Sequence, residues 1–192
     1  MRVMKMEENT QKKKGLRWEL FDFVKILLIC FIAALGIKTF IAQPVFVEGS
    51  SMYPTLEDGE FGFTNLLGLS IEGINRGDIV IVSHDNEYWV KRVIGMPGEK
   101  IKCQDNVVYI NGEALEEPYL DNAYAQDIEK QQKYFTSDFD EVTLKDDEYF
   151  VMGDNRVVSA DSRIVGPFKR SQIVGKGVFV ISPLDQIGYH NQ

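Results

Sequence analysis

The chain has 192 residues, of which 44% are hydrophobic and 26% are charged, and its net charge at pH 7 is −8. This balance is that of an ordinary globular protein, and the length allows one domain large enough to bury its own core. The negative charge argues against a nucleic-acid partner, because binding to phosphates requires a basic surface.

The N-terminal region combines a basic segment with an apolar one. Residues 1–20 are rich in lysine and arginine, and residues 21–42 are mostly apolar, with Lys25 and Lys38 near the two ends. As a helix, the apolar stretch would be about 33 Å long, enough to cross a bilayer. By the positive-inside rule, the sequence predicts a single-pass protein of the cell membrane, with a cytoplasmic tail (1–20), a transmembrane helix (21–42) and an extracytoplasmic domain (43–192).

A cleaved secretory signal is the alternative for this region. The uncharged centre, residues 26–37, has the length of a signal-peptide core, and residues 34–36 read Ala-Leu-Gly, with small residues at the spacing of a cleavage site. The apolar run nevertheless continues through Phe40 and Ile41, and the N-terminal basic region is long for a signal peptide. An uncleaved anchor is therefore the preferred interpretation.

Beyond Pro44 the sequence predicts an all-β domain of antiparallel sheets, either a sandwich or a partly closed barrel. Short runs rich in β-branched and aromatic residues alternate with glycines, and Asn111-Gly112 is a hairpin-turn signal. The predicted strands are residues 77–82, 88–94, 106–110, 149–152 and 177–181.

Two segments do not fit this strand pattern. Residues 113–147 are acidic and are interpreted as a solvated insertion between strands, in which only residues 123–133 have any helical period. Residues 66–71 place several large aliphatic side chains in an apparent loop, which either packs into the core or touches the membrane surface.

The segment around Lys91 contains a candidate catalytic base. On a strand, Trp89, Lys91 and Val93 share one face. Such a lysine either has a buried stem with a solvated amine, or has a desolvated amine whose pKa is lowered so that it can act as a base. His84 and His190 lie in no known catalytic pattern, so the lysine is the better candidate.

The remaining chemistry-bearing residues offer an ion-pair network and no metal site. Cys30 and Cys103 are too far apart in the predicted organisation to pair or to form a cysteine-based metal site. Charged residues of opposite sign gather in residues 153–163, where with Arg92 they can form a network of ion pairs that fixes a loop.

Three segments together resemble bacterial type I signal peptidases of the Gram-positive kind. Residues 49–56 read Gly-Ser-Ser-Met-Tyr-Pro-Thr-Leu, residues 91–98 read Lys-Arg-Val-Ile-Gly-Met-Pro-Gly, and residues 153–163 read Gly-Asp-Asn-Arg-Val-Val-Ser-Ala-Asp-Ser-Arg. They are similar to the boxes of that family and follow the family's order. Gly-Asp-Ile-Val at residues 77–80 is similar to a fourth box. The resemblance covers residues 20–183.

The resemblance implies a membrane-bound serine endopeptidase that removes signal peptides from secretory preproteins. Its substrates would be cut after small residues at −1 and −3, and it would need no metal or organic cofactor. By position, Ser51 would be the nucleophile, Lys91 the base and Ser159 the hydroxyl that orients the lysine amine, with Asp161 and Arg163 as supports. The substrate pockets would be lined by Val47, Met52, Leu56, Trp89 and Val90.

Two positions depart from the family pattern. Gly49 stands where some members have a serine that serves as a second oxyanion donor, and Val158 stands where the family commonly has asparagine. The oxyanion hole would therefore use the Ser51 backbone N–H and another donor.

Two other functions remain as alternatives. One is a self-cleaving repressor-type peptidase, which shares the Ser/Lys dyad, and the other is an inactive membrane-anchored homologue. Cleavage of a preprotein in trans after small residues would distinguish a signal peptidase from both.

Overall fold

The computed structural model describes residues 18–36 and 42–191, so residues 1–17 of the expected cytoplasmic tail and residues 37–41 of the expected membrane segment lie outside it. Residues 18–36 are helical. They belong to one compact unit, and the chain from Ala42 onward forms another. Judged by length and apolar character, no helix within the described residues qualifies as a membrane crossing.

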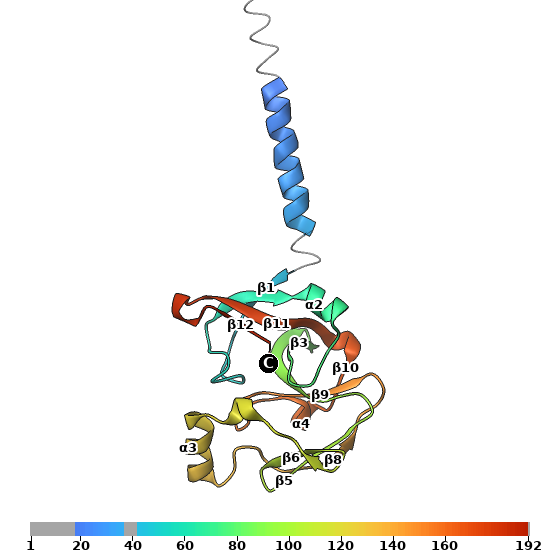
Figure 1. Cartoon of the computed structure of the whole chain (residues 1–192), viewed down its shortest axis with the longest axis vertical. Coiled ribbons are helices and arrows are strands. Elements are labelled where there is room, and N and C mark those ends of the chain that lie inside the picture. Colours follow the sequence, from blue (N-terminus) through green and yellow to red (C-terminus); the bar gives the residue numbers. More distant parts are fainter. Residues whose placement is uncertain (1–17, 37–41, 192) are drawn as a thin grey trace, which may run out of the picture. The chain divides into compact units, whose positions relative to one another are not determined.

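The second unit consists of two antiparallel sheets (Figure 1). The larger, eight-stranded sheet has the order β1-β2-β11-β3-β4-β9-β10, and β12 pairs with β11. Its strands are β1 (Ala42–Phe46), β2 (Phe61–Asn65), β3 (Ile79–His84), β4 (Glu87–Gly95), β9 (Glu148–Met152), β10 (Phe168–Lys169), β11 (Ile173–Ser182) and β12 (Gly188–His190). The smaller sheet has the order β7 (Glu113–Ala114), β6 (Val107–Ile110), β5 (Lys100–Gln104) and β8 (Phe139–Thr143).

The all-β prediction is confirmed, because every pairing between these strands is antiparallel and the helices are short. The predicted turn at Asn111-Gly112 is also confirmed. Both residues have positive φ, 53° and 88°, and Ile110 pairs with Glu113 across the turn. Asparagine and glycine tolerate this left-handed backbone, which is why they predict two-residue hairpins.

Strands β4 and β9 contribute to two cores at once. Val93 and Val151 pack into one cluster, whereas their neighbours Ile94 and Met152 pack into another, together with Ile101 of the smaller sheet. Successive side chains of a strand point to opposite faces, so two strands that are covered on both faces join the two layers. A third cluster lies under the turn that follows β1 and consists of Val47, Met52, Leu56, Ile79, Val178 and Val180.

The aliphatic segment expected to be a loop is instead the short helix α2 (Leu66–Ile71). The Asn65 side chain caps it by accepting a hydrogen bond from the Gly68 N–H at 2.8 Å. Leu69 is buried in the first core, whereas Ile71 is 78% exposed. Core packing is confirmed for Leu69, whereas contact of the segment with the membrane surface stays a prediction.

Residues 113–147 are mostly exposed, as expected of a solvated insertion, but they also form secondary structure and bury several apolar side chains. They include β7, the 3₁₀ turn η1 (Pro118–Leu120), the helix α3 (Ala123–Gln132) and β8. Ala125, Phe135 and Leu144 are buried, while most of the acidic side chains between them face solvent. The acidic composition reflects the outer surface of the segment and conceals the apolar residues on its inner surface.

Buried ion pairs connect the segments that carry the motifs. The Arg92 guanidinium donates to both carboxylate oxygens of Asp154, at 2.8 and 2.6 Å, and to the Gly77 carbonyl oxygen at 2.8 Å. Both paired side chains are almost completely buried. The network expected for residues 153–163 is present, since Arg163 pairs with Asp161 at 2.8 Å, although Arg156 pairs outside the motif with Glu117.

Asp154→Ala is expected to lower the free energy of unfolding by about 3–5 kcal/mol, because it leaves the Arg92 guanidinium buried without its counter-ion. The measurement is urea unfolding of the full chain in detergent. Glu141→Ala is the matched control: it breaks the pair between Lys100 and Glu141, whose side chains are 56% and 50% exposed, and should cost less than about 1 kcal/mol. Equal losses of unfolding free energy in the two variants would contradict the expectation that breaking the buried Arg92–Asp154 pair is more destabilising than breaking an exposed one.

Candidate active site

Ser51 lies in a tight turn between β1 and β2. The Gly49 N–H donates to the Asp58 carboxylate at 2.7 Å, and the Tyr53 N–H donates to the Ser50 carbonyl at 3.2 Å. Gly49 has a φ of 83°, a left-handed conformation that glycine adopts without strain. Gly49 lacks the hydroxyl that some family members have at this position, and its backbone conformation gives a separate reason for glycine there.

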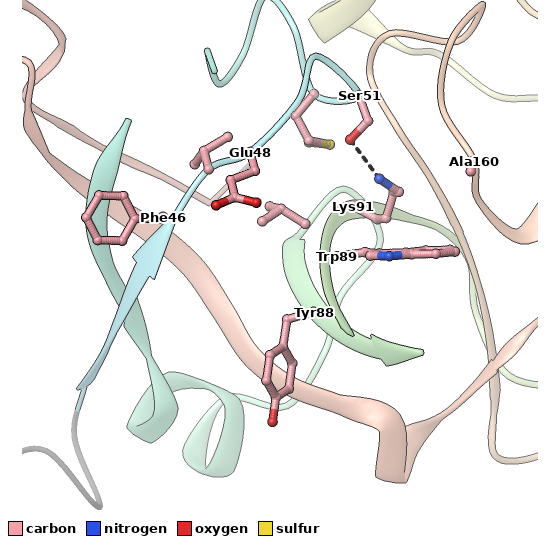
Figure 2. Close-up of a pocket in the computed structure, with 10 residues that line it drawn as sticks. Phe46, Glu48, Ser51, Tyr88, Trp89, Lys91 and Ala160 are labelled. Carbon is pink, nitrogen blue, oxygen red and sulfur yellow. Dashed lines mark hydrogen bonds between the residues drawn. The ribbon is translucent and has the colours of Figure 1, made fainter. Parts of the chain in front are cut away.

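The turn brings Ser51 to Lys91, which lies on β4 as predicted. The Lys91 Nζ and the Ser51 Oγ are 2.7 Å apart, a hydrogen-bond distance, although the two residues are separated by 40 positions in the sequence (Figure 2). Lys91 is only 3% exposed, and its Nζ lies 5.7 Å from the centre of the Trp89 ring. A nucleophile and a base in this contact have the geometry required for activation of the hydroxyl.

Burial lowers the pKa of Lys91 from 10.5 to about 8. The charged ammonium loses solvation in the interior, whereas the neutral amine loses little. The negative charge of Asp161 opposes this effect and raises the pKa, while the positive charge of Arg163 lowers it. The neutral amine is still the minor form at pH 7, but its fraction is far larger than that of a solvated lysine with a pKa of 10.5.

Ser159, Asp161 and Arg163 lie together beside this pair. Asp161 accepts hydrogen bonds from the Gly153 N–H at 3.0 Å and from Nε and Nη2 of Arg163, both at 2.8 Å. Burial raises the pKa of Asp161, but its hydrogen bonds with Arg163 and the positive charge of that residue outweigh this effect and hold the pKa below its usual value. Asp161 is therefore a carboxylate at neutral pH and keeps the Arg163 charge in place.

The Ser159 hydroxyl is buried near the dyad and donates to the Ala160 carbonyl oxygen at 3.5 Å. Within the described part of the chain, no hydrogen bond joins it to the Lys91 amine. Gly153 permits its position, since a Cβ at residue 153 would overlap both the Ser159 hydroxyl and the Ser51 carbonyl oxygen.

A cavity of about 300 Å³ opens at the dyad. Four of the five residues expected in the pockets line it, namely Val47, Met52, Trp89 and Val90. The fifth, Leu56, is completely buried in the core cluster that contains Val47 and Met52, so it supports the wall without lining it. The cavity also has lining residues that the sequence did not indicate: Phe46, Glu48, Tyr88 and Ala160.

A second cavity, of about 220 Å³, shares Phe46, Tyr88 and Val90 with the first. It extends between β1 and β3, where Val45 and Ile81 contribute to its lining. Strand alternation could have indicated Tyr88, because it lies on the same face of β4 as Val90. No pattern in the sequence indicates Ala160, which is brought to the cavity by the loop after β9.

Among the described residues, neither His84 nor His190 forms a hydrogen bond with Ser51 or Lys91. The His84 ring packs against the Trp89 ring, with centroids 4.6 Å apart, and His190 is on β12. Among residues 18–36 and 42–191, no cluster of histidine, cysteine and acidic side chains could hold a metal ion. Cys30 and Cys103 are both free thiols.

Asp161→Asn is expected to lower the pKa of Lys91 below its value of about 8, because the substitution removes the nearby negative charge that raises it. The pKa can be followed by NMR of ¹³C-labelled lysine, with the Lys91 signal assigned by its loss in Lys91→Arg. A pKa that rises in Asp161→Asn would contradict the electrostatic description of this site.

Comparisons with known proteins give a consistent family assignment. The family model described as signal peptidase, peptidase S26 matches residues 20–182. A signal peptidase I of Bacillus amyloliquefaciens is 41% identical, over 96% of this chain and 98% of that protein. Signal peptidase I T of Bacillus subtilis (strain 168) is 42% identical, over 94% of this chain and 93% of that protein.

Two more distant similarities are also found. Signal peptidase IB of Staphylococcus aureus (strain MRSA252) is 34% identical, over 90% of this chain and 94% of that protein. A crystal structure of a signal peptidase I from Enterococcus faecalis V583 is 34% identical and has a TM-score of 0.49, over 54% of this chain and 95% of that one. By the extent of the family match and the identity to full-length relatives, the chain belongs to the signal peptidase family, peptidase S26.

Proposed function

We propose that this chain is a type I signal peptidase, a serine endopeptidase that removes N-terminal signal peptides from secretory preproteins, with Ser51 as nucleophile and Lys91 as general base. The observation that carries the proposal is the 2.7 Å contact between Ser51 Oγ and a buried lysine whose pKa is lowered to about 8. Membership of the S26 family and the names of its relatives support the assignment of substrate.

In the proposed reaction, neutral Lys91 takes the proton of the Ser51 hydroxyl as Oγ attacks the carbonyl carbon of the substrate residue at −1. The C–N bond then breaks, and the Lys91 ammonium gives its proton to the departing amine of the mature protein. A water molecule then attacks the carbonyl carbon of the acyl-enzyme ester and loses a proton to Lys91. The ester C–O bond breaks, and the Lys91 ammonium returns that proton to the Ser51 oxygen, which restores the hydroxyl and the neutral amine. One amine therefore acts first as base and then as acid in each half-reaction.

The Ser51 backbone N–H is the proposed oxyanion donor. Among the described residues it makes no hydrogen bond, and it lies next to the attacking Oγ. A preorganised donor at this point stabilises the negative charge that develops on the carbonyl oxygen in the transition state. With Gly49 in place of a serine, the side chain at that position supplies no second donor.

The two adjoining cavities could receive the side chains at −1 and −3 of an extended substrate. In an extended substrate, alternate side chains lie on the same side and are roughly 7 Å apart. The cavity at the dyad would take the −1 side chain, and the adjoining cavity that shares Phe46, Tyr88 and Val90 would take the −3 side chain. The −2 side chain would then point away from the protein.

We also propose that residues 21–42 anchor the enzyme in the cell membrane, with residues 1–20 cytoplasmic and residues 43–192 outside. The support is the basic N-terminal flank, the apolar composition of the segment and the helical conformation of residues 18–36. The exposed apolar side chains Leu67 and Ile71 of α2 suit contact with a lipid surface.

Ser51→Ala should abolish cleavage of a preprotein in trans, with a loss of roughly 10⁴-fold or more, because the nucleophile is removed. Ser50→Ala is the matched control and should retain substantial activity. Lys91→Ala should be as inactive as Ser51→Ala, and the double variant no worse, because the two residues act as one unit. An active Ser51→Ala combined with an inactive Ser50→Ala would move the nucleophile by one residue, and an inactive wild type would favour the non-enzymatic alternative.

Protease added to intact spheroplasts should degrade the domain that contains Ser51 and should spare a tag fused to the N-terminus. The positive-inside rule is the physical reason, since basic residues are retained in the cytoplasm. Immunoblotting against the tag and the domain measures the result, and spheroplast lysis is the control that exposes the tag. Protection of the whole chain in intact spheroplasts would refute this topology.

A further inference from the structure

Asn155 holds the backbone on both sides of the nucleophile. Its N–H donates to the Ser51 carbonyl oxygen at 3.0 Å, and its side-chain Nδ2 donates to the Ser50 carbonyl oxygen, also at 3.0 Å. Asn155 is only 2% exposed. The second bond has a particular consequence, because the Ser50 carbonyl and the Ser51 N–H belong to the same planar peptide group. Fixing the carbonyl therefore fixes the direction of the N–H that is the proposed oxyanion donor.

The Asn155 side chain is itself oriented by Tyr124, the second residue of α3. The Tyr124 hydroxyl donates to the Asn155 Oδ1 at 3.2 Å. An asparagine amide has an accepting end and a donating end, and an oxygen that faced the Ser50 carbonyl could not hydrogen-bond to it. By occupying the accepting end, Tyr124 keeps the donating end turned toward Ser50.

The Tyr124 ring is held by aromatic neighbours. It lies edge-on to the Tyr53 ring, with centroids 4.9 Å apart and an interplanar angle of 87°, and edge-on to the buried Phe135 at 6.2 Å. Tyr53 belongs to the same turn as Ser51. Tyr124 is therefore connected to the turn that carries Ser51 in two ways: through its hydrogen bond to Asn155 and through its ring contact with Tyr53.

The segment that carries Tyr124 is fastened to the catalytic loops at other points. Arg156 pairs with Glu117 and donates to the Thr136 hydroxyl at 3.0 Å. The Arg92 guanidinium lies 4.0 Å from the centre of the Tyr119 ring. These contacts join both ends of the segment around α3 to the loop after β9 and to β4, so the placement of Tyr124 is defined from both sides.

We propose that Tyr124 is a positioning residue for the reaction: by orienting the Asn155 amide it sets the peptide plane between Ser50 and Ser51, and with it the oxyanion donor. The proposal rests on the proposed function for its catalytic consequence, but the orientation of the peptide group is independent of it. The segment 113–147 is then part of the catalytic apparatus although it carries none of the motif residues.

The first test compares Tyr124→Phe with wild type in cleavage of a preprotein by the full chain in detergent. The substitution keeps the ring and removes only the hydroxyl, so kcat should fall about 2- to 10-fold, the range for one lost hydrogen bond. KM should change less than twofold, because Tyr124 lines neither cavity. The pH at which kcat reaches half its maximum, which is expected to follow the pKa of Lys91, should not change. Tyr124 is not among the residues that shift the pKa of that lysine.

Tyr134→Phe is the matched control. Tyr134 lies on the same segment, is 46% exposed and has no hydrogen bond among the described residues, so this variant should equal wild type. Melting temperatures of both variants identify any general loss of stability. If Tyr124→Phe keeps kcat within twofold of wild type, or if kcat falls equally in Tyr134→Phe, the proposal is overturned.

The second test asks whether Tyr124 acts through Asn155. In an Asn155→Ala background, Tyr124→Phe should cause no further fall in kcat, because the amide that it orients is absent. An additive fall would overturn the proposal. If Asn155→Ala does not fold, NMR supplies the same information: the Ser51 amide signal should shift in Tyr124→Phe and remain unchanged in Tyr134→Phe.

The NMR measurement also distinguishes a failure of the proposed function from a failure of the positioning role of Tyr124. If the wild-type chain cleaves no preprotein, the proposed function fails, yet a shifted Ser51 amide signal in Tyr124→Phe would still support the positioning role. An unchanged Ser51 signal would overturn that role whatever the activity.

Discussion

The burial of the Lys91 amine is the constraint on which the rest of the structure depends. An ammonium removed from water is costly, so the protein must provide enough surrounding structure to keep water out while leaving one open side for a substrate. Strand β4 meets this requirement by placing Lys91 in the middle of the larger sheet, between β3 and β9. The Trp89 ring and the turn that carries Ser51 cover the amine, and the charges of Asp161 and Arg163 adjust its pKa in opposite directions.

The sequence predicted the local features of this arrangement well. Residues 88–94 were expected to form a strand with Trp89, Lys91 and Val93 on one face, and β4 spans Glu87–Gly95 with these residues as expected. The turn at Asn111-Gly112 and the charged network around Asp161 also follow from patterns that are complete within a few residues. Such features can be predicted from the sequence because the residues that determine them are only a few positions apart in the chain.

What the sequence did not predict depends on contacts between distant segments. Leu56 was expected in the pocket wall but is fully buried, because only the packing of the turn on β3 and β11 determines which of its apolar residues face inward. The acidic residues 113–147 suggested a solvated insertion, and nothing local indicates that Tyr124 meets Asn155. Resemblance to a family indicated Ser159, but the space for its hydroxyl beside the Ser51 carbonyl oxygen depends on the absence of a side chain at Gly153, a contact between distant segments.

The sharing of β4 and β9 between two cores limits how far the domain can be altered. The smaller sheet lies within one continuous stretch of chain between these two strands, so the chain could in principle be cut at its two ends. Excision of that sheet would expose Ile94 on β4, the strand that carries Lys91, together with Phe150 and Met152 on β9. The two layers should therefore melt in a single cooperative step, and a minimal enzyme made from the larger sheet alone would require a new back surface.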